Sequence, residues 1–292
     1  MITFLNQLPI GLSIGAVLLL VALGLSITFG QMGVINMAHG DFLMAGAYTA
    51  YEVQRFAGRQ AVVVALPVAF AVAGTMGLVL ERLLIRRFYG RPLDTLLLTY
   101  GVSLVLQQFA RDTFGAPNVE VLSPVWLRGA ADIHGVRLPY ARMFIMVLAT
   151  VCVVALWSYS NHSAAGRRMR ATVQNRQLAA VAGIHTGGSD KLTFFIGSGL
   201  AGVAGVGLTL IGPIGPTLGT NYIVDAFLVV IVGGLGHLRG TVLAALGLGL
   251  LSSYFEFWTT NSLAKVGVFV AIVAFLQFRP QGLFVIRTRR LT

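Results

Sequence analysis

The stretch LPIGLSIGAVLLLVALGLSITF, residues 8–29, decides the fold of this chain and contains no charged side chain. At about 1.5 Å of rise per residue, a helix of this length crosses the roughly 30 Å hydrocarbon core of a bilayer. A removable signal peptide has a basic start and a shorter apolar core of about 7–15 residues. No Lys or Arg precedes residue 8. We therefore expect a retained transmembrane helix.

The composition extends this conclusion along the chain. Of the 292 residues, 56% are hydrophobic and only 11% are charged, with a mean hydropathy of +0.81. Average soluble domains carry about 25% charged residues, so a soluble enzyme and a disordered chain are poor fits. Short apolar segments interrupted by glycine are typical of half-helices inside a bundle. Further apolar segments follow at 42–54, 61–80, 94–110, 140–160, 191–212, 222–238, 240–257 and 263–278.

These segments predict an all-α fold, a polytopic transmembrane helical bundle with about eight spans plus short broken or re-entrant helices. We expect residues 1–292 to form a single transmembrane domain. The net charge of +11 lies in loops between the apolar segments, which does not favour a nucleic-acid partner. With the N-terminus outside, about two thirds of the Lys and Arg residues fall on the inner side, so the positive-inside rule predicts N-out and C-in.

Two loops stand out by their length. Residues 111–139 contain several Pro and Gly residues and predict an ordered outer loop, with a short hairpin as one form. Residues 161–190 form the longest inner loop, with helical spacing from Ala165 to Ala182. Gly183 is placed to end that helix, and Ser189 or Asp190 to cap the next one. Such an amphipathic helix lies along membrane lipid or docks into a partner's groove.

Two glycine-containing stretches interrupt the apolar pattern: GQMGVINMAHGD at residues 30–41 and VGGLGHLRG at residues 232–240. Polar groups at bilayer depth are costly unless they are paired or face a watery cavity. Asn36 and His39 therefore either line a substrate path or satisfy backbone groups freed by the break. The expected helix breaks are Gly33, Gly40, Gly233, Gly234 and Gly236.

Enzyme chemistry is not expected of this chain, and we assign no catalytic residue. A phosphate-binding loop of the G-x-x-x-x-G-K-[ST] type requires Gly-Lys, but Lys191 follows Asp190 and Lys265 follows Ala264. The histidines show no metal-ligand spacing, so neither a metal nor a cofactor is expected. An intramembrane serine protease, the alternative from another class, would require Ser198 and His237 to meet on facing helices.

Several segments together resemble the permease subunits of ABC importers in the branched-chain amino acid and urea group. They are GVINMAHG at 33–40 with GAY at 46–48, the stretch 166–183, VGGLG at 232–236 and RPQGL at 279–283. The resemblance covers nearly the whole chain. Within the group, the chain looks more like the urea permease subunits, on the basis of QQ at 107–108, FGAPNVEV at 114–121 and PVWL at 124–127.

The resemblance implies a permease domain in a bacterial cytoplasmic (inner) membrane. It also implies partners: a second related permease subunit, two ATP-binding subunits that hydrolyse ATP, and an extracytoplasmic substrate-binding protein. The loop that matches Arg167–Gly183 would be the coupling helix that docks onto the ATPase, although a basic face lying on anionic lipid remains an alternative. The expected coupling residues are Gly166, Arg167, Arg170, Asn175, Ala180 and Gly183.

Our main hypothesis is that the chain forms half of a translocation path for urea. Urea is small and neutral, and its path needs amide and hydroxyl groups rather than fixed charges. The expected path residues are Gln31, Asn36, His39, Tyr48 and Gln107. A permease for branched-chain amino acids, which are zwitterions beside an apolar group, is the alternative within the same machine, and a passive channel is a third hypothesis.

Overall fold

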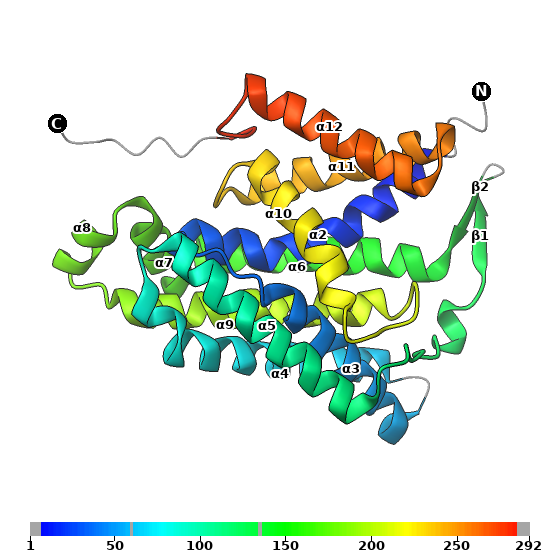
Figure 1. Cartoon of the computed structure of the whole chain (residues 1–292), viewed down its shortest axis with the longest axis horizontal. Helices are drawn as coiled ribbons and strands as arrows, with labels where there is room; N and C mark the ends of the chain where they lie inside the picture. Colours follow the sequence, from blue (N-terminus) through cyan, green and yellow to red (C-terminus); the bar gives the residue numbers. More distant parts are fainter. Residues whose placement is uncertain (1–6, 59–60, 134–135, 285–292) are drawn as a thin grey trace.

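The computed structural model describes residues 7–58, 61–133 and 136–284, which are mostly helical (Figure 1). Each predicted apolar segment coincides with one of the longer helices, and the predicted all-α class is confirmed. The α-helices are α2 (Gln7–Met32), α3 (His39–Ala57), α4 (Val62–Leu83), α5 (Pro92–Phe114), α6 (Tyr140–His162), α7 (Ala164–Gln174), α8 (Arg176–Val181), α9 (Thr186–Leu208), α10 (Leu218–Gly233), α11 (Leu238–Trp258) and α12 (Asn261–Phe278). Two short 3-10 helices are η1 (Ile85–Phe88) and η2 (Val125–Leu127).

Length and composition make five of these helices candidate membrane spans: α2, α4, α6, α9 and α11. α10 and α12 are apolar but shorter. α3 carries Asp41, Glu52 and Arg55, so its apolar character is weaker. This mixture of long apolar helices and shorter or more polar ones is the architecture of a multi-pass helical membrane protein.

Small residues bring the helix backbones at the centre of the bundle into direct contact. α2 and α9 are the most buried of the candidate spans. A Cβ built on Gly24 of α2 would lie 2.0 Å from the carbonyl oxygen of Gly197 in α9, and one on Gly46 of α3 would lie 2.1 Å from that of Gly202. No larger residue fits at these positions. The close packing therefore holds α2, α3 and α9 as one unit.

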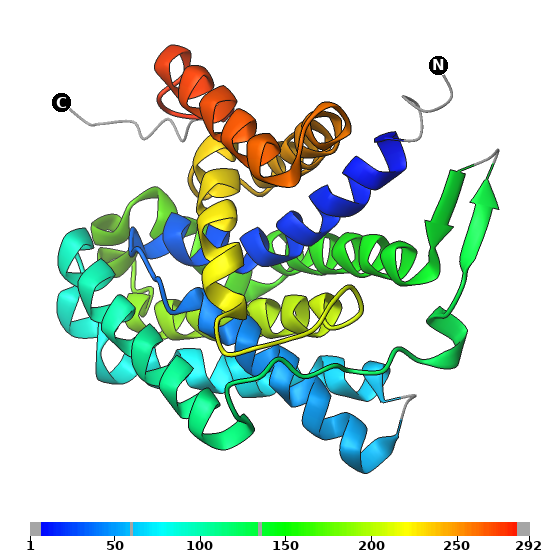
Figure 2. The same cartoon turned by 45° about the vertical axis from the view of Figure 1, so that its right-hand side comes forward.

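The two predicted loops lie at opposite ends of the bundle (Figures 1 and 2). One end carries the antiparallel hairpin of β1 (Ala130–Ile133) and β2 (Val136–Pro139), which confirms the short hairpin expected in the outer loop. α5 continues to Phe114, so this loop begins later than residue 111. The start of α2 lies near the hairpin, whereas α7 and α8 lie at the opposite end (Figure 1).

The inner loop differs from the single helix expected over residues 165–182. Asn175 is extended, with φ −158° and ψ 107°, and divides the segment into α7 and α8. Its side-chain oxygen accepts a hydrogen bond from the Leu178 amide at 3.0 Å, because an Asn side chain competes with the helix for backbone donors and makes a good N-cap. Gly183, at φ +83°, ends α8 as the left-handed residue of a Schellman-type stop.

Positive φ angles occur at three of the expected helix breaks, Gly33, Gly234 and Gly236. Gly233 is the last residue of α10. Gly40 does not break a helix, because it lies in the first turn of α3. A Cβ there would lie 2.6 Å from the carbonyl oxygen of Gly219. Gly40 is therefore needed for the close approach of α3 to α10, and the expectation of a break at this residue was wrong.

Candidate functional site

The connection between α2 and α3 returns into the bundle. His39 Nε2 lies 3.2 Å from the carbonyl oxygen of Val21, a residue near the middle of α2, so α3 begins at mid-depth. Asn36 is 1% exposed, and neither its amide oxygen nor its amide nitrogen forms a hydrogen bond with the described residues. His39 thus contacts a backbone carbonyl, whereas the Asn36 amide is buried without a partner and does not line the pocket beside Gln107.

Asp41 and Gln107 meet at a small pocket of about 100 Å³ between α3, α5 and α10. The Gln107 amide nitrogen lies 3.0 Å from Ser103 Oγ, 3.2 Å from Thr220 Oγ1 and 3.4 Å from Asp41 Oδ1. Asp41 is 1% exposed, and its Oδ2 has no hydrogen-bond partner among the described residues. A buried carboxylate oxygen without a donor can accept a hydrogen bond from an ammonium or amide group of a substrate.

Tyr48 lies two turns after Asp41, on the same side of α3. Its ring is stacked on Phe114, with a centroid distance of 4.2 Å and an interplanar angle of 11°. The hydroxyl is buried and forms no hydrogen bond with the described residues. Tyr48 and Asp41 therefore present unsatisfied polar atoms along one side of α3.

Gln31, another expected path residue, lies in a different polar cluster at the α8 end of the bundle. Its amide nitrogen donates to Asp190 Oδ1 at 2.8 Å, and its amide oxygen accepts from Thr193 Oγ1 at 2.5 Å. Both ends of this amide are thus bonded to α9. The expectation that Ser189 or Asp190 caps that helix was wrong, because α9 begins at Thr186 and Asp190 lies one turn inside it.

Asp190 is fully buried and forms an ion pair with Arg176 of α8. The Arg176 guanidinium also lies 5.2 Å from the ring centroid of Tyr89, whose hydroxyl donates to Glu81 Oε1 at 2.7 Å. The hydrogen bond to Asp190 raises the pKa of Arg176 above its usual value. Burial and the hydrogen bond to Glu81 raise the pKa of Tyr89. Arg176 therefore stays charged, and Tyr89 stays a donor.

We call Gln31, Glu81, Tyr89, Arg176 and Asp190 the inner cluster. It connects α8 to α2, α4 and α9. Apart from Gln31, its members were not among the expected functional residues. Acidic residues beside apolar segments require a partner. This rule could have indicated from the sequence that Glu81 and Asp190 are paired. The identity of that partner depends on contacts between distant segments.

The expected coupling residues of α7 bond back to the end of α6. Arg170 Nη1 donates to Asn161 Oδ1 at 2.5 Å, and Arg167 Nη1 donates to the carbonyl oxygen of His162 at 3.1 Å. The Gly166 amide donates to Ser163 Oγ, the N-cap of α7, at 2.8 Å. A Cβ on Gly166 would lie 2.2 Å from the Tyr159 carbonyl oxygen, so α7 packs tightly on α6.

α8 presents an exposed apolar tip at the end of the molecule (Figure 1). Leu178 is 55% exposed and Val181 is 87% exposed, and Ala180 between them is exposed as well. The helix is short and is held at its start by the Asn175 cap and at its end by Gly183. A capped knob with exposed apolar side chains suits a protein contact better than a solvated loop does.

The structure does not bring Ser198 and His237 together as a catalytic pair. A Cβ on Gly77 of α4 would lie 2.0 Å from Ser198 Oγ, so this hydroxyl lies between α9 and α4. The His237 ring is stacked on Phe284, with a centroid distance of 6.1 Å. In the described part of the chain, no three His, Cys, Asp or Glu side chains are grouped so that they could hold a metal ion.

Residues 8–276 match the family described as "Branched-chain amino acid transport system / permease component". The chain is 29% identical to the high-affinity branched-chain amino acid transport system permease protein BraD of Pseudomonas aeruginosa, over 96% of this chain and 95% of the relative. It is 27% identical to the corresponding permease protein LivH of Escherichia coli K12, over the same shares of both chains. It is 26% identical to a probable branched-chain amino acid transport permease protein of Methanocaldococcus jannaschii, over 91% and 88%.

No solved structure matches this chain. The family match covers most of the sequence, and the relatives align along almost their whole length. The chain is therefore a transport permease and not an enzyme, and it belongs to the family of permease components of branched-chain amino acid transport systems.

Proposed function

We propose that this chain is a membrane subunit of an ATP-driven ABC importer for branched-chain amino acids. The observation that carries the proposal is the alignment over nearly the full length with permease proteins named for this transport in both Pseudomonas aeruginosa and Escherichia coli. These relatives favour the amino-acid alternative over urea, our main expectation from the sequence. Its partners would be a second permease subunit, two ATP-binding subunits and an extracytoplasmic binding protein.

The pocket beside Asp41 and Gln107 is our candidate for a narrow section of the translocation path. It lies where α3 begins at mid-depth, and broken helices at that depth are common sites of substrate contact in transporters. Within the pocket, Asp41 Oδ2 has no donor among the described residues and supplies an acceptor for an ammonium group. Tyr48 would continue the path along α3.

The α8 tip is our candidate for the contact with an ATP-binding subunit. Leu178 and Val181 supply the exposed apolar surface, and the ion pair between Arg176 and Asp190 ties that surface to the bundle. A movement of the ATP-binding subunit would thus reach α9 and α2 through a bonded connection. The α7 arginines would hold the base of the knob.

We further propose that the α8 end faces the cytoplasm of a bacterial cell and that the hairpin end faces outward. The basic residues of α7 and α8 favour this orientation by the positive-inside rule. The start of α2 lies at the hairpin end (Figure 1), which agrees with an N-terminus outside.

Labelled leucine uptake into proteoliposomes that contain the assembled importer and its binding protein tests the proposed function. We expect ATP-dependent accumulation of leucine that excess valine or isoleucine inhibits and excess urea does not. ATP-dependent accumulation of urea without leucine transport would overturn the substrate and restore the urea hypothesis. Uptake that persists in liposomes without the ATP-binding subunits would show a passive channel instead.

A further inference from the structure

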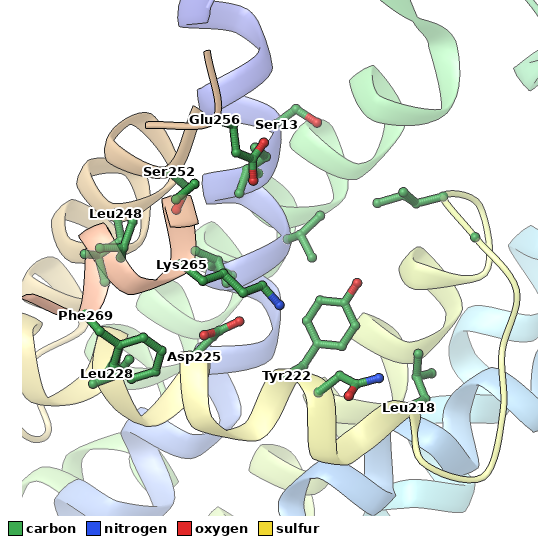
Figure 3. Close-up of a pocket in the computed structure, with 18 of the residues that line it drawn as sticks. Ser13, Leu218, Tyr222, Asp225, Leu228, Leu248, Ser252, Glu256, Lys265 and Phe269 are labelled. Carbon is green, nitrogen blue, oxygen red and sulfur yellow. The ribbon is translucent and has the colours of Figure 1, made fainter. Parts of the chain in front are cut away.

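A second cavity lies in the half of the bundle near the hairpin and shares no lining residue with the pocket beside Gln107. It has a volume of about 650 Å³ and opens between α2, α10, α11 and α12 (Figure 3). Small-molecule sites occupy about 300–1,000 Å³, with mostly apolar walls and a few converging polar groups. We call this space the outer cavity.

The outer cavity contains both signs of charge in equal number. Its lining includes the cations Arg142 and Lys265 and the carboxylates Asp225 and Glu256. None of these four forms an ion pair with another described residue. Arg142 is held at the edge by a hydrogen bond to Ser13 Oγ at 3.4 Å.

Lys265 and Asp225 face each other across this space. Figure 3 shows the Lys265 ammonium reaching into the cavity toward Asp225 and Tyr222. The Lys265 ammonium interacts electrostatically with the Asp225 carboxylate, although the two are too far apart for an ion pair. Lys265 is exposed, whereas Asp225 is only partly exposed, so the carboxylate is the more costly of the two charges to leave without a partner or ligand. Both side chains line the cavity, so a ligand inside it can contact both charges.

We propose that the outer cavity binds a zwitterionic amino acid with an apolar side chain. Asp225 receives the ligand's ammonium group and Lys265 receives its carboxylate. Leu228, Leu248 and Phe269, which line the same space, form the wall against which the aliphatic side chain packs. This inference rests on the proposed function, and it assigns to that function a first binding site that the substrate meets before it reaches the pocket beside Gln107.

The charge balance selects this class of ligand. A lining with two cations and two anions has no net charge, so it disfavours a cation or an anion alone and offers no advantage to uncharged urea. A zwitterionic lipid headgroup shares the same pair of charges. The amino acid fits better, because the outer cavity adjoins the candidate substrate path. The two spaces share α10 as a wall, which contributes Tyr222 and Asp225 to the outer cavity and Thr220 and Ile223, on its other side, to the pocket beside Gln107. The outer cavity therefore lies one helix away from the candidate path.

Protection of an introduced cysteine tests occupancy of the cavity directly. Cys152 is the only cysteine in the chain, so Cys152→Ser provides the background. Ser252→Cys places a thiol on the cavity lining, and Glu120→Cys places one on the exposed outer loop as the matched control. The assembled importer is kept in nanodiscs of phosphatidylglycerol, which lacks a zwitterionic headgroup. Labelling of this chain by N-ethylmaleimide is followed by mass spectrometry.

We expect leucine to slow labelling at position 252 and to leave labelling at position 120 unchanged. Leucinamide lacks the carboxylate and 4-methylpentanoate lacks the ammonium group, so each should protect about tenfold less effectively. Asp225→Asn and Lys265→Met, added to the same background, should each weaken leucine protection about tenfold or more. Glu52→Gln, which removes a partly exposed carboxylate outside the cavity, should not.

Several results would overturn the assignment. Protection by added phosphatidylethanolamine and not by leucine would assign the cavity to lipid. A thiol at position 252 that does not react even without leucine would show that another subunit fills the cavity. Leucine uptake by the wild type without any protection would remove the site and leave the proposed function standing. Protection without uptake would support the site and overturn the importer, and the absence of both would overturn the two together.

Discussion

Arg176→Met is the most informative change in the inner cluster, because it leaves the buried Asp190 carboxylate without its cation. Exposed ion pairs contribute about 0–1 kcal/mol, whereas removing one member of a fully buried pair costs about 3–5 kcal/mol. The Asp190 side chain is 0% exposed and that of Arg176 is 42% exposed, so this pair lies between the two cases. Asp190 also keeps its hydrogen bond from Gln31. We expect the free energy of unfolding to fall by about 2 kcal/mol.

The reverse change, Asp190→Asn, should cost less. It leaves Arg176 without a partner, but the guanidinium is partly exposed and water can solvate it. We expect a loss of about 1 kcal/mol. The double variant leaves no charge unpaired inside the protein, so it should be more stable than the sum of the two single losses predicts. The difference measures the coupling between the two side chains.

The assay is the apparent Tm of the purified importer, followed by the loss of its monodisperse peak in size-exclusion chromatography after heating. A loss of 2 kcal/mol corresponds to roughly 4–8 °C. The matched control is Arg91→Met, because the Arg91 and Asp94 pair is exposed on both sides and its atoms are 3.8 Å apart. It should shift the apparent Tm very little. A shift for Arg176→Met no larger than that of the control would refute the reasoning.

Three further predictions concern coupling, the path and helix packing. Asn175→Ala removes the N-cap of α8, at a cost of about 1 kcal/mol. It should raise the number of ATP molecules hydrolysed per leucine imported. An unchanged ratio would exclude α8 as the coupling knob. Gln107→Leu should lower leucine uptake per assembled complex about tenfold, whereas Gln108→Leu, at an exposed position, should not; equal effects on uptake would remove Gln107 from the path. Gly46→Leu should prevent recovery of folded protein, because a Cβ there would lie 2.1 Å from an α9 carbonyl oxygen. In the control Gly101→Ala, the new Cβ on α5 would meet no atom within 4 Å, so this change should raise the apparent Tm slightly.

The positions of the long helices could be predicted because each depends on the local sequence alone. An uninterrupted apolar segment of about 20 residues must satisfy its backbone internally in a membrane. The hairpin could also be predicted, because its strands lie in a segment that contains several Gly and Pro residues. The division at Asn175 was missed because helical spacing continues through it, and only its hydrogen bond to Leu178 shows the cap. Gly40 was wrongly predicted to break a helix, because the sequence does not distinguish a glycine needed for close packing from one that ends a helix.

The candidate site could be predicted only in part. The polar residues of the first interruption marked the start of α3, and Gln107 was expected on the path. Its partner Asp41, 66 positions away in the chain, could not be identified without the structure. Gln31 looked equivalent to Asn36, but the fold bonds the first to α9 and leaves the second without a partner. Residue type alone therefore did not separate an amide whose hydrogen bonds are made within the bundle from one that has none.

The inner cluster and the outer cavity differ in whether their charged side chains form ion pairs, and this difference connects the separate proposals. At the α8 end, Asp190 of α9 is bonded to Arg176 of α8 and Gln31 of α2, so its charge stabilises the contacts between these helices. In the outer cavity, Asp225 and Lys265 face each other without forming an ion pair. A paired charge transmits movement because its bonds resist separation, whereas an unpaired charge retains its capacity to bind a ligand. An importer needs the first property where ATP-binding subunits pull and the second where substrate enters, and the orientation that we propose would place them at those ends.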